Sequence, residues 1–99
     1  MRISKEQKAD IVELVKRHVS QNARVWLFGS RAKEDARGGD VDLFLEVTNL
    51  QDTVARKIDL RLALEDRWGE IKVDILIHDT RYPEQAIHHI ARSEGVRLL

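Results

Sequence analysis

Apolar residues recur every three or four positions near the N-terminus, a spacing that predicts an amphipathic helix. Its apolar stripe consists of Ile11, Leu14, Val15 and Val19. Ser4 and Gln7 have the spacing of a capping box, in which each side chain bonds the other residue's backbone. We therefore expect the helix to begin just after Ser4 and to fade near residues 20–22.

Three short runs carry the β-branched and aromatic residues that are typical of strands. They are residues 24–28 (RVWLF), 41–47 (VDLFLEV) and 72–77 (KVDILI). Gly29 is expected to end the first run. In the second, the odd positions Val41, Leu43 and Leu45 point one way, and Asp42, Phe44 and Glu46 point the other, together with Asp40. In the third, Val73, Ile75 and Ile77 share one face.

Further helices are predicted between and after these strands. Residues 30–37 form a short helix that Ser30 could cap and that Gly38-Gly39 would break. Residues 52–68 form the longest helix, which Gly69 ends. Its apolar face is expected to be broad, because it has two stripes: Val54, Ile58 and Leu62, and Leu60, Leu64 and Trp68.

Pro83 suits the first turn of a last helix, which Gly95 would stop. The stripe of this helix is expected to be Ala86, Ile87, Ile90 and Ala91. Residues 96–99 then form a short edge strand or pack as a tail. The alternation of helices and strands predicts one α/β layered domain over residues 1–99, a small mixed β-sheet packed with helices.

Composition narrows the function classes. Lys plus Arg equals Asp plus Glu at 17 each, so the formal net charge is zero and a nucleic-acid partner is disfavoured. The chain has no cysteine, which excludes disulfides and thiolate metal sites. No apolar run approaches the roughly 20 residues that span a bilayer, and the N-terminus lacks the apolar core of a signal peptide. We expect no membrane partner and a cytoplasmic location.

Asp40 and Asp42 are separated by one residue at the start of the second strand. On a strand, both side chains leave the same face, with Cα atoms roughly 7 Å apart. Two carboxylates there repel each other, and a divalent cation would relieve the repulsion. Mg²⁺ typically uses one or two carboxylates together with waters and substrate phosphates. The alternative is a solvated strand entrance after a turn, where Asp is common.

Gly29-Ser30 could supply the phosphate-binding half of such a site. Glycine lets the backbone approach a ligand closely, and the start of the following helix favours an anion. The alternative for Ser30 is a simple helix cap. Asp74 shares a face with Leu76 as Asp42 does with Phe44, so neighbouring strands would bring Asp74 beside Asp40 and Asp42. Three carboxylates suit two metal ions that clamp the oxygens of a phosphoryl displacement; the alternative for Asp74 is a lone strand-entry acid.

The stretch "GSRA…GGDVDLFLEV", followed by "KVDILI", resembles the DNA polymerase β-type nucleotidyltransferase superfamily. The similarity covers roughly residues 24–78, and the small size resembles the minimal nucleotidyltransferases, the antitoxins of HEPN/MNT toxin–antitoxin pairs. The resemblance implies a polymerase β palm-like fold in which Gly29, Ser30 and Arg31 bind the nucleotide. It implies that Asp40, Asp42 and Asp74 bind Mg²⁺, and that Asp74 assists deprotonation of the attacking hydroxyl.

The same resemblance implies transfer of AMP from ATP to a hydroxyl, the acceptor being a tyrosine of a partner HEPN toxin. We expect the acceptor to arrive on this partner, since little chain length remains for an acceptor domain. Glu34 departs from the glycine that many minimal members have, and could crowd the triphosphate. An antitoxin that neutralises its partner by binding alone is the main alternative. A subunit that modifies a small molecule or RNA at an oligomer interface is another.

The remaining conspicuous residues have simpler interpretations. Arg31 and Arg37 could contact phosphates, but a solvated face is the preferred interpretation of each from the residues alone. The adjacent residues His88 and His89 would diverge on a helix, and His78 beside Asp79 is interpreted as a loop pair, so no histidine metal site is expected. Trp26 and Trp68 are interpreted as core residues.

Overall fold

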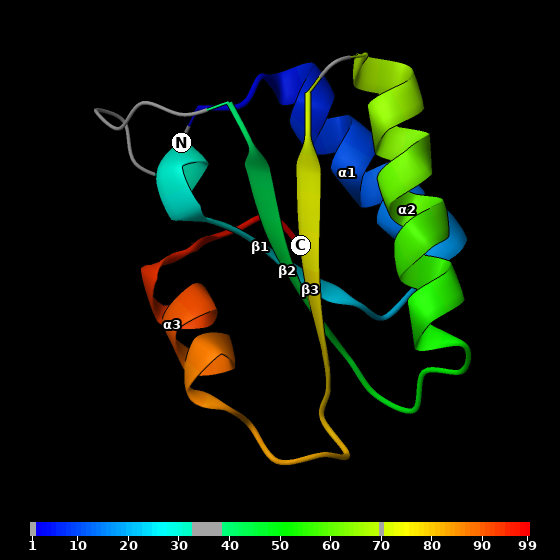
Figure 1. Ribbon diagram of the computed structural model, residues 1–99, viewed down its shortest axis with the longest axis vertical. Coiled ribbons are helices and arrows are strands. Elements are labelled where there is room, and N and C mark those ends of the chain that lie inside the picture. Colours follow the sequence, from blue (N-terminus) through cyan, green and yellow to red (C-terminus); the bar gives the residue numbers. More distant parts are fainter. Residues whose placement is uncertain (1, 33–38, 70) are drawn as a thin grey trace.

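A computed structural model describes residues 2–32, 39–69 and 71–99 (Figure 1). Its elements, in chain order, are α1 (Lys5–His18), β1 (Arg24–Phe28), the 3-10 helix η1 (Gly29–Ala32), β2 (Val41–Val47), α2 (Thr53–Trp68), β3 (Val73–Asp79), α3 (Ala86–Glu94) and β4 (Val96–Arg97). The predicted alternation of helices and strands is confirmed. No helix in the described ranges is both long and apolar enough to cross a bilayer.

The strands form one mixed sheet in the order β3-β2-β1-β4. β2 and β3 are parallel, whereas β1 is antiparallel to both of its neighbours, β2 and β4. The C-terminal residues therefore include a short edge strand, the first of the two predicted arrangements. This sheet, with helices packed on it, is the small mixed α/β fold that the sequence predicts.

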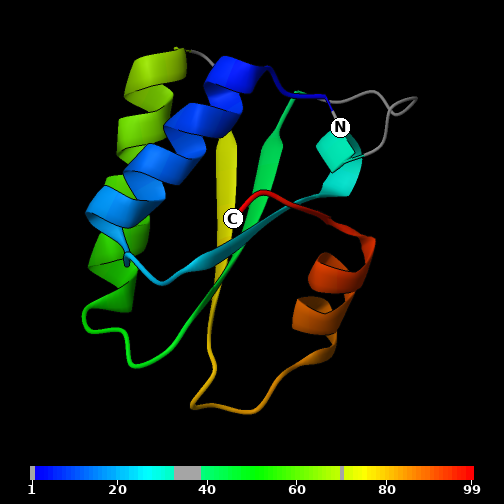
Figure 2. The ribbon, with the colours of Figure 1, turned by 180° about the vertical axis from the view of Figure 1, so that it is seen from behind.

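Helices cover both faces of the sheet. α1 and α2 lie on one side, and η1 and α3 lie on the other, as opposite views of the molecule show (Figures 1 and 2). The main core lies under α1 and α2 and contains Val41, Leu43 and Leu45 of the central strand β2. A smaller cluster on the α3 side joins Trp26 and Phe44 to Ala91. The predicted alternation along β2 therefore separates two apolar cores.

The start of α1 agrees with the predicted capping box. The Gln7 N–H donates to the Ser4 Oγ at 3.0 Å, and the Ser4 N–H donates to the Gln7 Oε1 at 2.9 Å. The predicted apolar stripe is buried, and its members are Ile11, Leu14, Val15 and Val19. Local chemistry and tertiary packing thus favour the same helix.

Only one of the two apolar stripes predicted for α2 is buried. Leu60 and Leu64 are fully buried in the main core. The other stripe is exposed, since Val54, Ile58 and Leu62 have exposed fractions of 72%, 41% and 56%. The broad apolar face is therefore only partly buried, because α1 and the sheet contact α2 on one side and leave its outer side to solvent.

The predictions for α3 need two corrections. The helix begins at Ala86 after the N-cap Gln85, so Pro83 precedes it instead of occupying its first turn. Its buried residues are His88 and Ala91, whereas Ile87 and Ile90 are each 46% exposed. The predicted stripe was wrong because the imidazole of His88 packs against the sheet and accepts a hydrogen bond from the Gln85 N–H at 3.1 Å.

His78 lies within β3 and is buried, so its interpretation as a loop residue was wrong. Its ring stacks on His88 with centroids 4.2 Å apart, and His88 in turn stacks on Phe44. Stacked rings direct their nitrogen lone pairs within nearly parallel planes, so the two imidazoles are poorly placed to share one ion. The pair is part of the contact between β3 and α3.

The sequence predicts a helix over residues 30–37. The observed 3-10 helix η1 starts at Gly29, one residue before the predicted start. Residues 33–38 lie outside the described residues, and with them the remainder of that predicted helix, Glu34 and Arg37. Trp26 is buried, as predicted. Trp68 is half-buried at the edge of the main core, where its Nε1–H donates to Asp10 at 2.9 Å.

Candidate functional site

Two of the predicted acids lie side by side in the sheet. In the parallel pair of β2 and β3, Asp42 is opposite Asp74 in register, and neighbouring strands lie about 4.8 Å apart. Two positions further along, Phe44 and Leu76 pack in the small core on the α3 side. Because side chains alternate along a strand, Asp42 and Asp74 share that same face. The condition on which the sequence placed Asp74 beside Asp42, that the two strands are neighbours, is therefore met.

The acidic pair lies at the end of this face that α3 does not cover. β2 and β3 both begin at the top of Figure 1, with η1 beside the start of β2, whereas α3 lies lower against the same face. Asp42 is half-buried and Asp74 is exposed. One end of the face is therefore closed by apolar packing, and the other is open to an incoming ligand.

The glycine-serine turn meets the acidic pair through β1. Phe28 is opposite Asp42 in the antiparallel ladder, so the chain turns at Gly29 directly beside this carboxylate. Gly29 has φ of 69°, a left-handed conformation that glycine adopts at little cost. A Cβ at this position would lie 3.1 Å from the Asp42 Cγ and closer still to Oδ2. A side chain at this position would therefore require the Asp42 carboxylate or the turn to move.

Asp40 lies immediately before β2 and is exposed, and its alignment with Asp42 stays a prediction. A brace from η1 holds the residue before Asp40. The Nη2 of Arg31 donates to the carbonyl oxygen of Gly39 at 3.0 Å, and its Nη1 donates to that of Arg2 at 2.8 Å. Arg31 thus joins the N-terminal segment to the approach to Asp40.

This bracing role for Arg31 was missed from the sequence. Both terminal nitrogens of its guanidinium bind backbone carbonyls, and its Nε is buried without a partner in the described part of the structure. A sequence signal for such long-range contacts does not exist, because Arg31 is separated from Arg2 by 29 positions. The contact between Arg31 and a nucleotide stays a prediction.

The electrostatics of the pair favour a bound cation. Burial raises the pKa of the Asp42 carboxyl above its ordinary value, and the charges of Asp74 and Asp40 raise it further. Lys72 opposes these effects. Within the described ranges, none of the three carboxylates takes part in a hydrogen bond or an ion pair. The site therefore concentrates negative charge that the neighbouring protein only partly balances.

Lys72 is a second residue of the site that the sequence interpretation missed. It directly precedes β3, and its carbonyl oxygen accepts a hydrogen bond from the Val41 N–H at 2.9 Å. This bond aligns the starts of β2 and β3, and the ammonium group lies close enough to lower the pKa of Asp42. The sequence did offer a signal for this residue, because the basic Lys72 lies two positions before the predicted site acid Asp74.

The carboxylates of Asp42 and Asp74 suit a Mg²⁺ ion that keeps part of its water shell. In the part of the chain that the structure describes, no three His, Cys, Asp or Glu side chains converge on a ready-made metal position. Mg²⁺ rarely needs one, because it usually keeps several waters and takes one or two carboxylates plus substrate phosphates. Asp42 and Asp74 match that requirement, with oxygen ligands, adjacent strands and an unbalanced charge.

Comparison with known families agrees with this geometry. A model of the family described as polymerase beta, nucleotidyltransferase, matches residues 7–98. The chain belongs to the polymerase β nucleotidyltransferase family. The match extends well beyond the segment from β1 to β3 and includes most of α1 and all of α3.

A solved structure has the same fold as this nucleotidyltransferase. It is a crystal structure of the toxin–antitoxin pair MntA–HpeT, in a mutant with two Asp-to-Glu replacements. The two chains superpose with a TM-score of 0.73 at 16% sequence identity, over 93% of this chain and 71% of the other. A search of curated proteins found no significant match.

Proposed function

We propose that this nucleotidyltransferase transfers AMP from ATP to a hydroxyl group of a partner toxin, and that it acts as the antitoxin of that toxin. The observation that supports it best is the convergence of Asp42, Asp74 and Gly29 at the open end of one sheet face. The similar fold of a chain from a toxin–antitoxin pair supports the antitoxin role. The aspartates replaced in that mutant are two positions apart, the spacing of Asp40 and Asp42.

In this proposal Gly29 and Ser30 hold the triphosphate at the turn after β1, where a missing side chain leaves room beside Asp42. Arg31 supports the approach to Asp40 and is proposed to contact the nucleotide as well. Asp40, Asp42 and Asp74 would bind Mg²⁺, which supplies positive charge to the phosphate oxygens and to the leaving pyrophosphate. Asp42 is half-buried, whereas Asp40 and Asp74 are exposed. The exposed side of this acidic site is therefore accessible to an acceptor.

The transfer step is an in-line displacement. The acceptor hydroxyl oxygen forms a bond to the α-phosphorus of ATP as the bond to pyrophosphate breaks. Asp74 lies on the strand at the edge of the sheet and is exposed, so we assign it the removal of the hydroxyl proton. Asp42 lies on β2, between β1 and β3, and we assign it to bind the Mg²⁺ that holds the triphosphate.

The proposed acceptor is a tyrosine of a small helical HEPN-family toxin. We expect the partner to supply the acceptor hydroxyl at the open acidic end. The test is incubation of the chain with a cognate HEPN protein, ATP and Mg²⁺. Each transferred AMP should add about 329 Da to the partner by mass spectrometry.

The matched control is Asp74→Asn, which should leave the partner's mass unchanged. Full neutralisation of the toxin by the unaltered chain, with no mass change on any residue, would instead support an antitoxin that acts by binding alone. Labelling of RNA or of a small hydroxyl compound, with the HEPN protein unmodified, would point to a different acceptor.

A further inference from the structure

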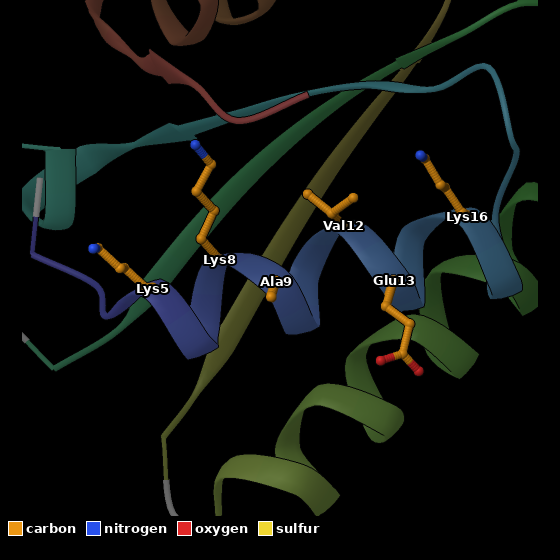
Figure 3. A pocket seen from close by; sticks show the side chains of 6 residues that line it. All are labelled: Lys5, Lys8, Ala9, Val12, Glu13 and Lys16. Carbon is orange, nitrogen blue, oxygen red and sulfur yellow. The ribbon is translucent and has the colours of Figure 1, made fainter.

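The outward face of α1 forms a shallow hollow that is distinct from the acidic site. Its volume is about 490 Å³, and it is lined by Lys5, Lys8, Ala9, Val12, Glu13 and Lys16 (Figure 3). We call this surface the lysine face. From Lys5 to Lys16 it extends over about 16 Å of helix, roughly three turns. Its length suits contact with one helix of similar length.

The charges of α1 are divided between its two sides. Asp10 and Glu13 bind Arg67 of α2, at 2.9 Å and 3.1 Å. Glu13 also binds Arg17. Two of the three acids of α1, Asp10 and Glu13, are therefore neutralised within the helix pair α1 and α2, whereas Glu6 in the first turn takes no part in these ion pairs.

The lysines of α1 have no such partners. In the described part of the chain, the side-chain ammonium groups of Lys5, Lys8 and Lys16 form no ion pair and no hydrogen bond. The chain as a whole has zero formal charge, so the lysine face is a local positive surface on a neutral protein. A partner with complementary negative charge would be attracted to this face.

Between the lysines lies an apolar floor. Ala9 and Val12 are three positions apart and so lie on the same side of α1. Both are small, which lets the backbone of a second helix approach closely. Lysine stems can cover apolar surface while their ammonium groups remain at its edge. The face therefore combines an apolar centre with a basic rim.

The position of the face favours a helix as its occupant. Lys8, Val12 and Lys16 point toward β1 and the C-terminal segment, whereas Glu13 points toward α2 (Figure 3). α2 and α1 lie next to each other on the sheet, and α1 is the helix nearer its β4 edge (Figure 2). A third helix beside α1 would continue this layer. A nucleic-acid backbone would make no use of the apolar floor.

We infer that the lysine face docks an acidic amphipathic helix of the partner toxin, with small apolar residues against Ala9 and Val12 and carboxylates against Lys5, Lys8 and Lys16. This inference rests on the proposed function for the existence of the toxin. It places the docking contact on the side of the sheet opposite the acidic site, so docking and transfer are separable.

The test compares two charge reversals of equal size. Lys8→Glu combined with Lys16→Glu alters the lysine face, and Lys57→Glu combined with Arg61→Glu alters α2 by the same charge. Calorimetry measures the affinity of each for a cognate HEPN protein at two salt concentrations. The lysine-face variant should lose affinity by about tenfold or more and lose most of its salt dependence, and the α2 variant should stay within about twofold.

A second variant, Val12→Gln, tests the apolar floor and should weaken binding without altering its salt dependence. Circular dichroism and Mg·ATP affinity should be unchanged in every variant, which separates docking from folding and from the acidic site. Equal toxin affinity in the lysine-face and control variants would overturn the inference and leave the proposed function standing. Absence of toxin binding by the unaltered chain would overturn both. Lysine-dependent binding of RNA or of anionic vesicles, with toxin affinity unaffected, would also overturn the inference.

Discussion

Gly29 packs directly against the carboxyl group of Asp42, so that a Cβ on Gly29 would lie 3.1 Å from the Asp42 Cγ. This contact joins the end of β1 to the start of β2, and it places the turn proposed to hold the triphosphate beside the carboxylate proposed to bind Mg²⁺. The space that a side chain would fill is small. Any residue other than glycine must displace the carboxylate or the turn.

Gly29→Ala should therefore abolish measurable Mg·ATP binding. The left-handed backbone also strains an alanine, which should cost about 1–2 kcal/mol of unfolding free energy. Gly69→Ala is the control, because Gly69 has φ of 81° but its added Cβ would meet no atom within 4 Å. Urea unfolding should show both losses of stability, and calorimetry should show loss of ATP binding in Gly29→Ala alone. Normal ATP binding by Gly29→Ala would contradict the placement of the triphosphate.

The two paired acids should have different roles. Asp74→Asn should keep Mg·ATP affinity within a few-fold while transfer falls by about 10²- to 10⁴-fold, because a proton acceptor acts mainly in the transition state. Asp42→Asn should lose both ATP binding and transfer. Calorimetry and single-turnover mass spectrometry distinguish these outcomes. Transfer at the wild-type rate by Asp74→Asn would show that Asp74 is only a strand-entry residue.

Asp42→Asn should also raise stability at neutral pH when no metal is present. The pKa of Asp42 is raised in the folded state, so ionisation of this group costs more free energy in the folded chain than in the unfolded chain. The unaltered chain should lose stability as pH rises from the ordinary Asp pKa of about 3.9 through the folded value, and the loss should persist above it. Urea midpoints measured with EDTA should show a smaller loss in Asp42→Asn. A lower midpoint than the unaltered chain at pH 7 would contradict this electrostatic account.

The sequence predicted the strands well because three of them carry strong local patterns. β1 and β2 have the predicted bounds, 24–28 and 41–47, and β3 extends only two residues beyond its predicted end. The acid and large apolar residue spaced by two on β2 and β3 correctly placed Asp42 beside Asp74. This part of the site follows from side-chain alternation once the two strands are neighbours.

The buried faces of α2 and α3 and the contacts of Arg31 depend on tertiary packing, which the periodicity of the sequence does not reveal. An apolar stripe shows that a helix can be buried on that side, but not whether another element is available to cover it. Val54 of α2 and Ile87 of α3 are exposed for this reason. The brace from Arg31 to Gly39 has no sequence signal, because it depends on how η1 sits against the approach to β2.

Two leucines of α2 that the sequence treats alike should differ in their importance for stability. Leu60 is fully buried in the main core, whereas Leu62 is 56% exposed. Leu60→Ala should cost about 2–5 kcal/mol of unfolding free energy, and Leu62→Ala should stay within about 0.5 kcal/mol. Urea unfolding of the two variants measures this difference. Similar costs for both would show that α2 is covered on its outer side in solution.

Stability should fall in mild acid because of the contact between α3 and β3. Burial lowers the pKa of His88 below its ordinary value, and the adjacent His78 lowers it further. Arg92 acts in the same direction, while Glu84 opposes them. Since the unfolded chain then binds more protons than the folded chain, stability should decrease as pH falls below about 6.5, the ordinary His pKa.

Protonation of His88 would also remove the acceptor that its Nδ1 offers to the Gln85 N–H, so the start of α3 should loosen first. Urea midpoints between pH 5 and 8 should decline more steeply toward acid in the unaltered chain than in His88→Gln. His89→Gln, at the exposed neighbouring position, should keep the full slope. The ring signals of His88 in NMR should titrate below the ordinary His pKa of about 6.5. An unchanged slope in His88→Gln would assign the acid sensitivity to another group and leave the stacked pair with a packing role alone.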